Sequence, residues 1–309
     1  MLYGRYLFQL VFNSLTLLPP FKGSTFRGVF GIALKKVICP LKKQDCTLCL
    51  LRGRCIYLEI FEKPPATDKP GIPSPPHPFI LEPPLSDQTE YQPGEECALN
   101  LILLGKANEY LPYFVYAVEQ MGRQGIGKKM AGKRSTFRLK EIRNGDRLVY
   151  DSAKGDFYRP EPQQLALENF EQEIVGQRWE RLSLRLLTPL RLKFENRLQA
   201  ELPFHVLIRA ALRRIAQLNQ HFGDGEPKLD YTGLVARAEK VNIERTDLRW
   251  FDWKRYSNRQ EQSMLMGGMI GEITYRGDLT EFLPLLRYCE KVHLGKATTF
   301  GLGQIQVCL

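Results

Sequence analysis

Four cysteines lie within 17 residues, in the pattern Cys39-x6-Cys46-x2-Cys49-x5-Cys55. Four thiolates on one short loop can surround a tetrahedral metal ion, and the central x2 pair is typical of zinc sites. Iron–sulfur clusters use the same ligands at varied spacings. We therefore predict a structural zinc ion, or alternatively an iron–sulfur cluster, held by these four residues. Four buried thiols without a metal are the other interpretation.

Residues 123–147 form the most basic stretch, with nine Lys and Arg side chains against two acidic ones. Within it, Gly127-x4-Gly132-Lys133 is close to a phosphate-binding loop, but Arg134 replaces the magnesium-binding hydroxyl, so we exclude a nucleotide site. A loose basic segment is suited to contact along the phosphates of a polyanion, although a solvated loop without a ligand has the same composition. The predicted contact residues are Lys128, Lys129, Lys133, Arg134 and Arg138.

A histidine and two arginines share one face of a predicted helix in the second half of the chain. His205, Arg209 and Arg213 are spaced four residues apart, so they form a row beside the apolar stripe of that helix. Histidine exchanges protons near neutral pH, and arginine binds phosphodiesters. The row is therefore a candidate site for acid–base chemistry on a phosphate. A rim histidine hydrogen-bonded to backbone is the alternative.

Aromatic and basic residues alternate in residues 249–259. Aromatic rings stack on the bases of single-stranded RNA, and neighbouring cations bind its phosphates. Large rings also fill protein cores, and we expect two or more of these four rings to do so. The rings are Trp250, Phe251, Trp253 and Tyr256, and the cations are Arg249, Lys254, Arg255 and Arg259.

A glycine-rich stretch, HLGKATTFGLG, occupies residues 293–303. Gly295, Gly301 and Gly303 permit a ligand to approach the backbone closely, and Lys296 supplies positive charge. We predict a binding loop here, with an ordinary connecting loop as the alternative.

The charge balance indicates a polyanionic partner. The 309 residues carry a formal charge of +10, and the first 150 hold 21 Lys and Arg against 13 Asp and Glu. Nucleic acid or a lipid surface is therefore the first partner to test. The apolar stretches are too short for a spanning helix and no signal peptide is apparent, so we expect no membrane partner and a cytoplasmic protein with reduced cysteines.

The order of predicted elements repeats along the chain. Each half reads as strand, helix, strands, helix, strand, which is typical of an α+β unit with helices on one face of an antiparallel sheet. We therefore predict two tandem ferredoxin-like domains, residues 1–177 with the cysteine loop and residues 178–309 with the glycine-rich loop. The predicted strands are 3–18, 97–104, 136–142, 147–150, 181–194 and 304–308, with further strand in 250–275, and the predicted helices are 24–39, 108–121, 202–218 and 281–290.

Two connecting segments differ in composition from the rest. Residues 62–94 hold ten of the 20 prolines, which predicts an extended or irregular insertion outside the core. Residues 151–177 are polar and acidic, which is typical of a linker. Ser24 or Thr25 is expected to cap the first helix.

Together, these motifs resemble the RAMP superfamily of CRISPR-associated proteins. The runs TPLRLKFENRL, LPFHVLIRAALRRI, RWFDWKRYSNRQ, MGGMIGEITYRGDL and HLGKATTFGLG are most similar to the branch of the sixth CRISPR-associated family that processes repeat RNA. The amino-terminal FKGSTFRGVFGIALKKVICP and the central GRQGIGKKMAGKRSTFRL fit the same branch. The resemblance therefore covers nearly the whole chain.

The resemblance implies an endoribonuclease that binds precursor CRISPR RNA and cuts it within its repeats. It implies metal-independent attack by the 2′-hydroxyl, giving a cyclic phosphate, with no catalytic cofactor. Subunits of a CRISPR effector complex are further implied partners. The main alternative is a non-catalytic RNA-binding subunit of an interference complex. A zinc-dependent DNA-binding regulator is a third hypothesis, resting on cysteines and charge alone.

The resemblance leaves the catalytic residues open, because family members often carry a histidine on the first helix and this chain has none there. His205 or His293 is then the expected acid or base, with His221 behind them, and Lys296 and Arg209 are expected to neutralise charge. Tyr256 is the expected additional proton donor. The expected RNA-binding residues of the second half are Arg209, Arg213, Arg255, Arg259, Gly295, Gly301 and Gly303.

Overall fold

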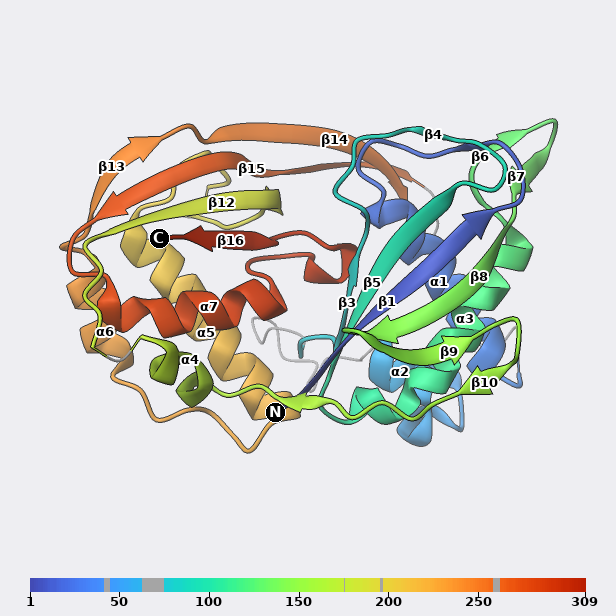
Figure 1. Ribbon diagram of the computed structural model, residues 1–309, viewed down its shortest axis with the longest axis horizontal. Helices are drawn as coiled ribbons and strands as arrows, with labels where there is room; N and C mark the ends of the chain where they lie inside the picture. The colour runs from blue at the N-terminus through green and yellow to red at the C-terminus, as the bar shows by residue number, and fades with distance from the viewer. Residues whose placement is uncertain (42–44, 63–74, 175, 195–196, 258–261) are drawn as a thin grey trace. The chain divides into compact units, whose positions relative to one another are not determined.

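The computed structural model divides into two compact units, residues 2–163 and residues 164–309 together with Met1 (Figure 1). We refer to them as the amino-terminal and carboxyl-terminal units. The structure describes residues 1–41, 45–62, 75–174, 176–194, 197–257 and 262–309, apart from the side chains of residues 47, 173, 254–257 and 262–265. In these ranges no helix is long and apolar enough to cross a membrane.

The amino-terminal unit is an antiparallel sheet with helices on one face. Its strands are β1 (Leu2–Phe12), β2 (Thr16–Leu17), β3 (Phe79–Glu82), β4 (Glu90–Tyr91), β5 (Glu96–Leu104), β6 (Ile126–Met130), β7 (Lys133–Ser135), β8 (Phe137–Asn144), β9 (Arg147–Asp151), β10 (Asp156–Phe157) and β11 (Gln163–Gln164). Its helices are α1 (Gly23–Ile38), α2 (Ile56–Ile60) and α3 (Leu111–Gln124), with 3-10 turns η1 (Cys46–Leu48), η2 (Arg52–Arg54) and η3 (Gly105–Tyr110).

The sheet of this unit has the ferredoxin-like strand order. The central strands run β8, β1, β5, β3, each antiparallel to its neighbour, and β9 and β10 extend the sheet beyond β8. Without the short strands, the chain order of this unit is β1, α1, β3, β5, α3, β8, which is the βαββαβ pattern. The prediction of a ferredoxin-like first domain is confirmed.

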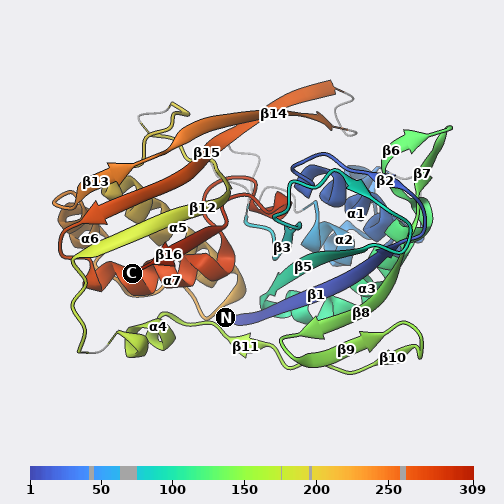
Figure 2. The ribbon, with the colours of Figure 1, turned by 45° about the horizontal axis from the view of Figure 1, so that its top comes forward.

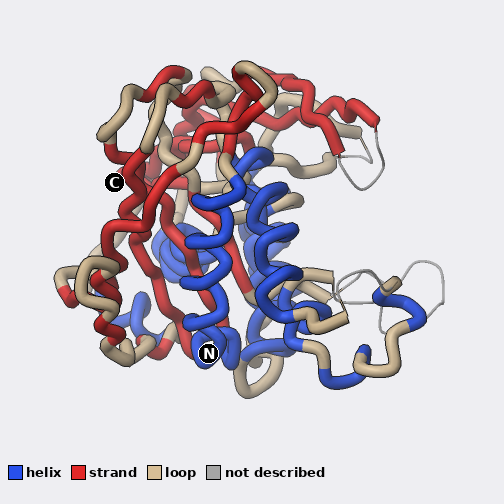
Figure 3. The backbone as a smooth tube through the Cα atoms, turned by 90° about the vertical axis from the view of Figure 1, so that its right-hand side faces the viewer, coloured by secondary structure: helices blue, strands red, loops and turns tan. Residues whose placement is uncertain are grey.

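The core of this unit lies between the sheet and helices α1 and α3, and strands and helices form separate layers (Figure 3). Tyr6, Phe8 and Leu10 alternate along β1 and point into it, as a strand with one buried face requires. From α1, Phe30 stacks on Phe114 of α3 with 5.6 Å between ring centroids. Because buried side chains recur on one face of each element, the apolar periodicity of the sequence predicts where these strands and helices lie.

Three local predictions for this unit are wrong. Residues 3–18 break into β1 and β2, and α1 starts at Gly23 without a side-chain cap from its N-cap residue Lys22. The proline-rich segment is not outside the core, because β3 within it is buried and pairs with β5. Its residues 63–74 lie outside the described ranges.

The carboxyl-terminal unit repeats the same architecture. Its strands are β12 (Arg181–Leu190), β13 (Asn242–Thr246), β14 (Arg249–Ser257), β15 (Gln262–Arg276) and β16 (Ile305–Cys308). Its helices are α4 (Leu167–Glu173), α5 (Phe204–Phe222), α6 (Tyr231–Ala238) and α7 (Leu283–Val292), with 3-10 turns η4 (Thr280–Phe282) and η5 (Thr298–Phe300). The sheet order is β13, β15, β12, β16, again antiparallel and ferredoxin-like (Figure 2).

Helix α5 supplies most of the core of this unit. The predicted stripe is confirmed, because all its members are buried: Phe204, Leu207, Ile208, Ala211, Leu212, Ile215 and Leu218. Phe204 meets Tyr275 of β15 edge-on at 4.8 Å between centroids and Phe282 at 5.1 Å. The strand β14 pairs with the outer part of β15, which extends past the end of its pairing with β12.

The predicted linker 151–177 contains structure. It holds β10, β11 and α4, and Leu165, Leu167 and Phe170 are buried. Phe170 meets Tyr288 of α7 edge-on at 6.2 Å between centroids. The compact carboxyl-terminal unit therefore begins at residue 164, whereas the sequence places the domain boundary after residue 177.

Candidate functional site

The histidine of the predicted row lies in the first turn of α5. His205 is half-buried, and its ring meets that of Phe194 edge-on with 6.2 Å between the centroids. Arg209 and Arg213 follow on the same helix and are exposed. Because an α-helix rises 1.5 Å per residue, these positions are about 6 Å apart along the axis. The structure therefore places the three side chains in one row.

Residues 191–203 connect β12 to α5 and lie next to two of the predicted catalytic residues. The carbonyl oxygen of Arg191 accepts a hydrogen bond of 3.0 Å from the Lys296 amide. Phe194, three residues later, meets His205. Three residues of extended chain span at most about 10 Å. His205 and Lys296 therefore lie along the same short segment, although 91 positions separate them in sequence.

The glycine-rich loop, residues 293–303, is shaped by packing of its own backbone. Gly301 and Gly303 are buried and have φ values of 81° and 73°, which glycine adopts without strain. A Cβ atom on Gly303 would overlap the carbonyl oxygen of Leu294, and the Leu294 amide donates to the Gly303 carbonyl at 2.9 Å. These two glycines therefore shape the loop, and Lys296 is its exposed cation. Their predicted contact with RNA stays a prediction.

The third predicted glycine is also held by the protein. Gly295 has a φ of 78°, and a Cβ atom there would lie 2.7 Å from the Arg191 carbonyl oxygen. That distance is far below van der Waals contact, so a side chain at this position would push the loop away from residues 191–194. Gly295 therefore keeps Lys296 close to the segment that faces His205.

Arg214 joins the glycine-rich loop to α5, and no sequence motif singles it out. Its Nη2 and Nε donate to the Val292 carbonyl oxygen at 2.8 and 3.2 Å, and Nη2 also donates to Thr298 Oγ1 at 3.3 Å. Burial lowers the pKa of Arg214 to about 10, so the guanidinium stays charged at neutral pH. In the sequence, Arg214 is another basic residue directly after Arg213, and only its burial in the structure distinguishes the two.

His293 is a structural residue in this fold. Its side chain is completely buried, and Nδ1 lies 3.0 Å from the Leu302 carbonyl oxygen. It follows the last residue of α7 with a φ of 57°, which turns the chain into the glycine-rich loop. A buried imidazole has no surface to offer an RNA strand. The prediction of a catalytic His293 is therefore wrong for this structure, and His205 is the remaining candidate.

The aromatic residues of β14 divide between its two faces. Phe251 is 39% exposed and stacks on the half-buried Trp253, with 5.8 Å between centroids and an interplanar angle of 24°. Trp250 Nε1 donates to Asp252 Oδ1 at 2.9 Å. Of the other predicted residues, Arg255 and Tyr256 lie on β14 with side chains outside the described set, and Arg259 lies outside the described ranges.

The basic segment of the amino-terminal unit is a hairpin. Strands β6 and β7 pair across a turn in which Ala131 and Gly132 have φ values of 46° and 79°. Ser135 Oγ donates to the Leu15 carbonyl oxygen at the base of the hairpin. Four cations on it are exposed and make no ion pair within the described residues; we call these four the basic hairpin: Lys128, Lys129, Lys133 and Arg134.

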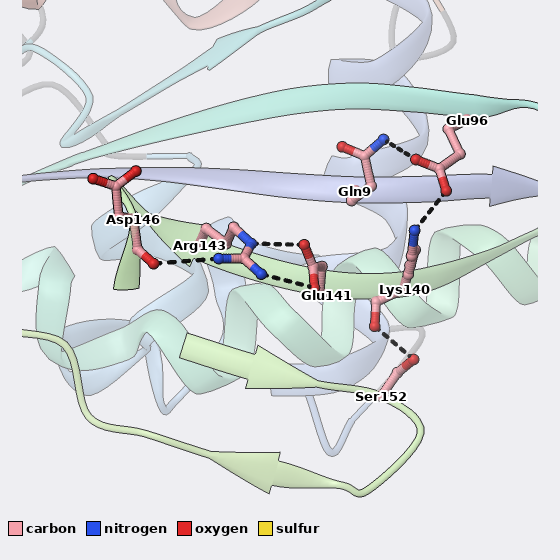
Figure 4. Close-up of polar contacts among 7 residues, drawn as sticks. All are labelled: Gln9, Glu96, Lys140, Glu141, Arg143, Asp146 and Ser152. Carbon is pink, nitrogen blue, oxygen red and sulfur yellow. Dashed lines mark hydrogen bonds and ion pairs between the residues drawn. The ribbon is translucent and has the colours of Figure 1, made fainter. Parts of the chain in front are cut away.

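Other cations near this hairpin are neutralised. Lys140 of β8 contacts Glu96 at 2.7 Å, and Arg143 contacts Glu141 at 2.7 Å (Figure 4). The hydrogen bond from Lys140 is the largest of the contacts that lower the pKa of Glu96, so this carboxylate stays charged beside it. Arg138, on the same strand, is exposed and makes no ion pair in the described part of the chain. Of these β8 cations, Arg138 is the one available to a polyanion.

The four cysteines of the predicted metal site are free thiols, each half-buried. Among the described residues, no three His, Cys, Asp or Glu side chains are grouped as a metal site. The Lys35 ammonium hydrogen-bonds to Cys46 and interacts with Cys39. The prediction of zinc or an iron–sulfur cluster finds no support in this arrangement.

Two family models match the chain. The model AF_1859_N, described as an N-terminal domain, matches residues 1–164. The model described as CRISPR-associated endoribonuclease Cas6 matches residues 184–305, which include the α5 row and the glycine-rich loop. Residues 184–305 therefore match the Cas6 family of CRISPR-associated proteins. The resemblance stated from its motifs is therefore confirmed.

Relatives of this Cas6-type protein cover nearly its whole length. A protein of Archaeoglobus fulgidus described as uncharacterized is 24% identical over 299 residues, which are 94% of this chain and 92% of that one. The Thermus thermophilus Cas6 TTHB231 product complex has a TM-score of 0.57 at 16% identity over 99% of this chain and 100% of that chain. A partial Cas6-RT-Cas1–Cas2 complex has a TM-score of 0.60 at 12% identity, covering 99% of this chain and 46% of that one. These structures show the shared tandem ferredoxin-like fold.

The α5 row and Lys296 provide the groups that phosphate chemistry needs. His205 supplies a proton-exchanging imidazole, and Lys296 supplies an exposed ammonium beside the same segment. Arg209 and Arg213 extend the positive charge along α5. Such a set can move a proton and balance the charge of a phosphodiester.

Proposed function

We propose that this protein is an endoribonuclease that binds precursor CRISPR RNA and cuts it within its repeats. The match of residues 184–305 to the Cas6 endoribonuclease model supports the class of reaction. The single observation that carries the site assignment is that His205 and Lys296 both lie against residues 191–194. The His205 ring contacts the Phe194 ring, and the Lys296 amide donates to the Arg191 carbonyl oxygen.

In the proposed reaction the 2′-hydroxyl oxygen next to the scissile phosphate attacks phosphorus, and the bond from phosphorus to the 5′-oxygen breaks. The proton of the 2′-hydroxyl passes to a base and another proton passes to the leaving 5′-oxygen, so the products are a 2′,3′-cyclic phosphate and a 5′-hydroxyl. His205 exchanges one of these protons. Lys296 and Arg209 balance the charge that develops on the phosphoryl oxygens. Tyr256, which the resemblance offers as a proton donor, is proposed for the other proton, so the proposed step uses no metal ion.

The proposed RNA contacts extend to both units. In the amino-terminal unit the basic hairpin and Arg138 present cations without ion-pair partners in the described residues. In the carboxyl-terminal unit Arg213 and the exposed face of the Phe251–Trp253 stack add to them. We propose roles for Arg255, Tyr256 and Arg259 on the resemblance alone. Subunits of a CRISPR effector complex are proposed as further partners.

The decisive experiment incubates the protein with its native repeat RNA in EDTA and follows the products. We expect cleavage that EDTA does not stop and a cyclic phosphate at the new 3′ end. His205→Ala should lower the single-turnover rate about 10²- to 10⁴-fold with little change in RNA affinity, because general acid–base catalysis contributes that much. His221→Ala, near the exposed end of the same helix, is the matched control and should cleave at the wild-type rate.

Two outcomes contradict this proposal. Tight binding of the repeat without scission would support the non-catalytic RNA-binding subunit instead. Cleavage that is lost in EDTA and restored by a divalent ion would show a metal-dependent reaction, for which the described residues assemble no site.

A further inference from the structure

A groove between α5 and α6 lies within the carboxyl-terminal unit, next to the row that starts at His205. Its volume is about 310 Å³, near the lower limit of pockets that hold small ligands. Helix α5 lines it with Arg209, Leu212, Arg213 and Ala216, and α6 lines it with Tyr231 and Val235.

The lining of the groove combines apolar and cationic residues. Leu212, Ala216 and Val235 are its aliphatic lining residues, and we call these three the apolar floor. Arg209 and Arg213 are exposed and make no ion pair or hydrogen bond that the described residues show. An apolar floor beside uncompensated guanidinium groups suits a ligand that is flat and apolar at one end and anionic at the other.

The aromatic member is held in place. The Tyr231 hydroxyl donates to the Pro227 carbonyl oxygen at 2.9 Å. Glu226 also lines the groove, and it interacts with the same hydroxyl, which ties its carboxylate to Tyr231. The lining therefore contains one carboxylate, which is engaged with Tyr231, and two guanidinium groups without an ion pair among the described residues, so its net charge is positive.

Helix geometry connects this groove to the cleavage site. Along the axis of α5, Arg209 and Arg213 lie about 6 and 12 Å from His205, because each follows the previous residue of the row by four positions. An RNA strand whose scissile phosphate lies at His205 and which follows this row would bring a neighbouring nucleotide over the groove. This continuity favours RNA over an acidic peptide as the occupant.

We propose that the α5–α6 groove holds one unpaired nucleotide of the RNA, with its base on the apolar floor beside Tyr231 and its phosphate on Arg209 and Arg213. This inference rests on the proposed function, because it places the nucleotide relative to His205. The groove gives the protein a preference for a repeat with an unpaired nucleotide near the cut, since a base in a helix cannot enter it.

The test uses one variant that fills the groove and one that removes charge. Ala216→Trp occupies the floor and leaves both arginines in place, whereas Arg213→Ala removes one phosphate contact. We expect each to weaken binding of the native repeat about tenfold, as loss of one stacked base or one phosphate contact does. Lys240→Ala, which removes an exposed cation two residues after the end of α6, is the matched control and should bind as the wild type does.

Repeat RNAs shortened by one nucleotide at a time from each end identify the nucleotide. At the truncation that removes it, wild type and Ala216→Trp should bind equally, because the two changes delete the same contact. Thermal melting confirms that each variant is folded. Equal affinity of wild type and Ala216→Trp for the full repeat would overturn the proposal while leaving cleavage, and thus the proposed function, intact.

A second measurement keeps the groove testable if the repeat is neither bound nor cut. Saturation-transfer NMR with the four nucleoside 5′-monophosphates should show binding that Ala216→Trp abolishes. Absence of such binding, or displacement of the nucleotide by a glutamate-rich peptide that binds more tightly, would overturn the assignment to RNA.

Discussion

Replacing Gly303 with alanine tests whether the glycine-rich loop is shaped by its own packing or is kept open for a ligand. In the structure Gly303 is buried with a φ of 73°, its amide donates to the Pro189 carbonyl oxygen at 3.0 Å, and its carbonyl accepts from Leu294. A Cβ atom would overlap the Leu294 carbonyl oxygen and lie 2.8 Å from the carbonyl carbon, both of which are backbone atoms. The substitution therefore forces the backbone to move.

Three costs add in Gly303→Ala. A left-handed φ costs a residue with a side chain about 1–2 kcal/mol. Overpacking against backbone costs about 1–3 kcal/mol, and a weakened hydrogen bond to Leu294 about 1 kcal/mol. Alanine recovers about 0.4–1 kcal/mol by restricting the unfolded chain. We expect a net destabilisation of about 2–6 kcal/mol, or about 4–20 °C in the melting temperature of the carboxyl-terminal unit.

Urea unfolding followed by circular dichroism measures this change, with two matched glycines as controls. Gly132 has a φ of 79°, but a Cβ atom added there would meet no atom within 4 Å, so Gly132→Ala should cost only the conformational part, about 1 kcal/mol. Gly28 lies in α1, and a Cβ atom there would also meet nothing within 4 Å, so Gly28→Ala should stabilise the helix by about 0.5–1 kcal/mol.

The order of the three variants decides the question. If Gly303→Ala unfolds at the same urea concentration as Gly132→Ala and loses only RNA affinity, the glycine is kept for a ligand and the packing argument is refuted. If it is the least stable of the three, the loop is shaped by the contacts with Leu294 and Pro189.

Three further predictions follow from other parts of the structure. Replacing the basic hairpin by alanine should reduce the slope of log affinity against log salt by about 0.7 per cation removed, about 3 in all, and an unchanged slope would show that the hairpin does not touch RNA. Cys49→Ser should change the free energy of unfolding by less than about 0.5 kcal/mol, as a substitution outside a metal site does; one zinc or iron per chain in elemental analysis would contradict this. Tyr6→Phe should destabilise the amino-terminal unit by about 1–3 kcal/mol, because the buried Asn108 Oδ1 loses its 2.9 Å partner, and a wild-type urea midpoint would show that water replaces the hydroxyl.

Elements with a long apolar period were predictable from sequence. The stripe of α5 and the strands around the Asn144-Gly145 turn appear where their patterns place them, since local spacing determines which face can be buried. Elements stabilised mainly by distant partners were missed. Strand β3 lies in a proline-rich segment and forms because β5 offers it a sheet edge, and α6 is a short helix packed against α5.

The candidate site, like the fold, was predictable from the sequence only in part. Residue type and helical spacing were sufficient to place His205, Arg209 and Arg213 in one row. Nothing local separates His205 from His293, or Arg213 from Arg214, because burial is decided by what packs against a residue. His293 is buried at the start of the glycine-rich loop, and Arg214 donates a hydrogen bond to Thr298 within that loop. The second contact joins positions 84 apart in the chain.

The sequence by itself determined the class of this protein, its repeated α+β order and the chemistry available to it, because motifs, periodicity and residue types are local properties. Only the tertiary structure decided which groups share a site. Lys296 reaches the segment facing His205 through one backbone hydrogen bond to Arg191. Among the described residues the four cysteines form no grouped metal site despite their spacing. Proximity in space depends on the packing of distant segments, and short-range spacing does not carry that information.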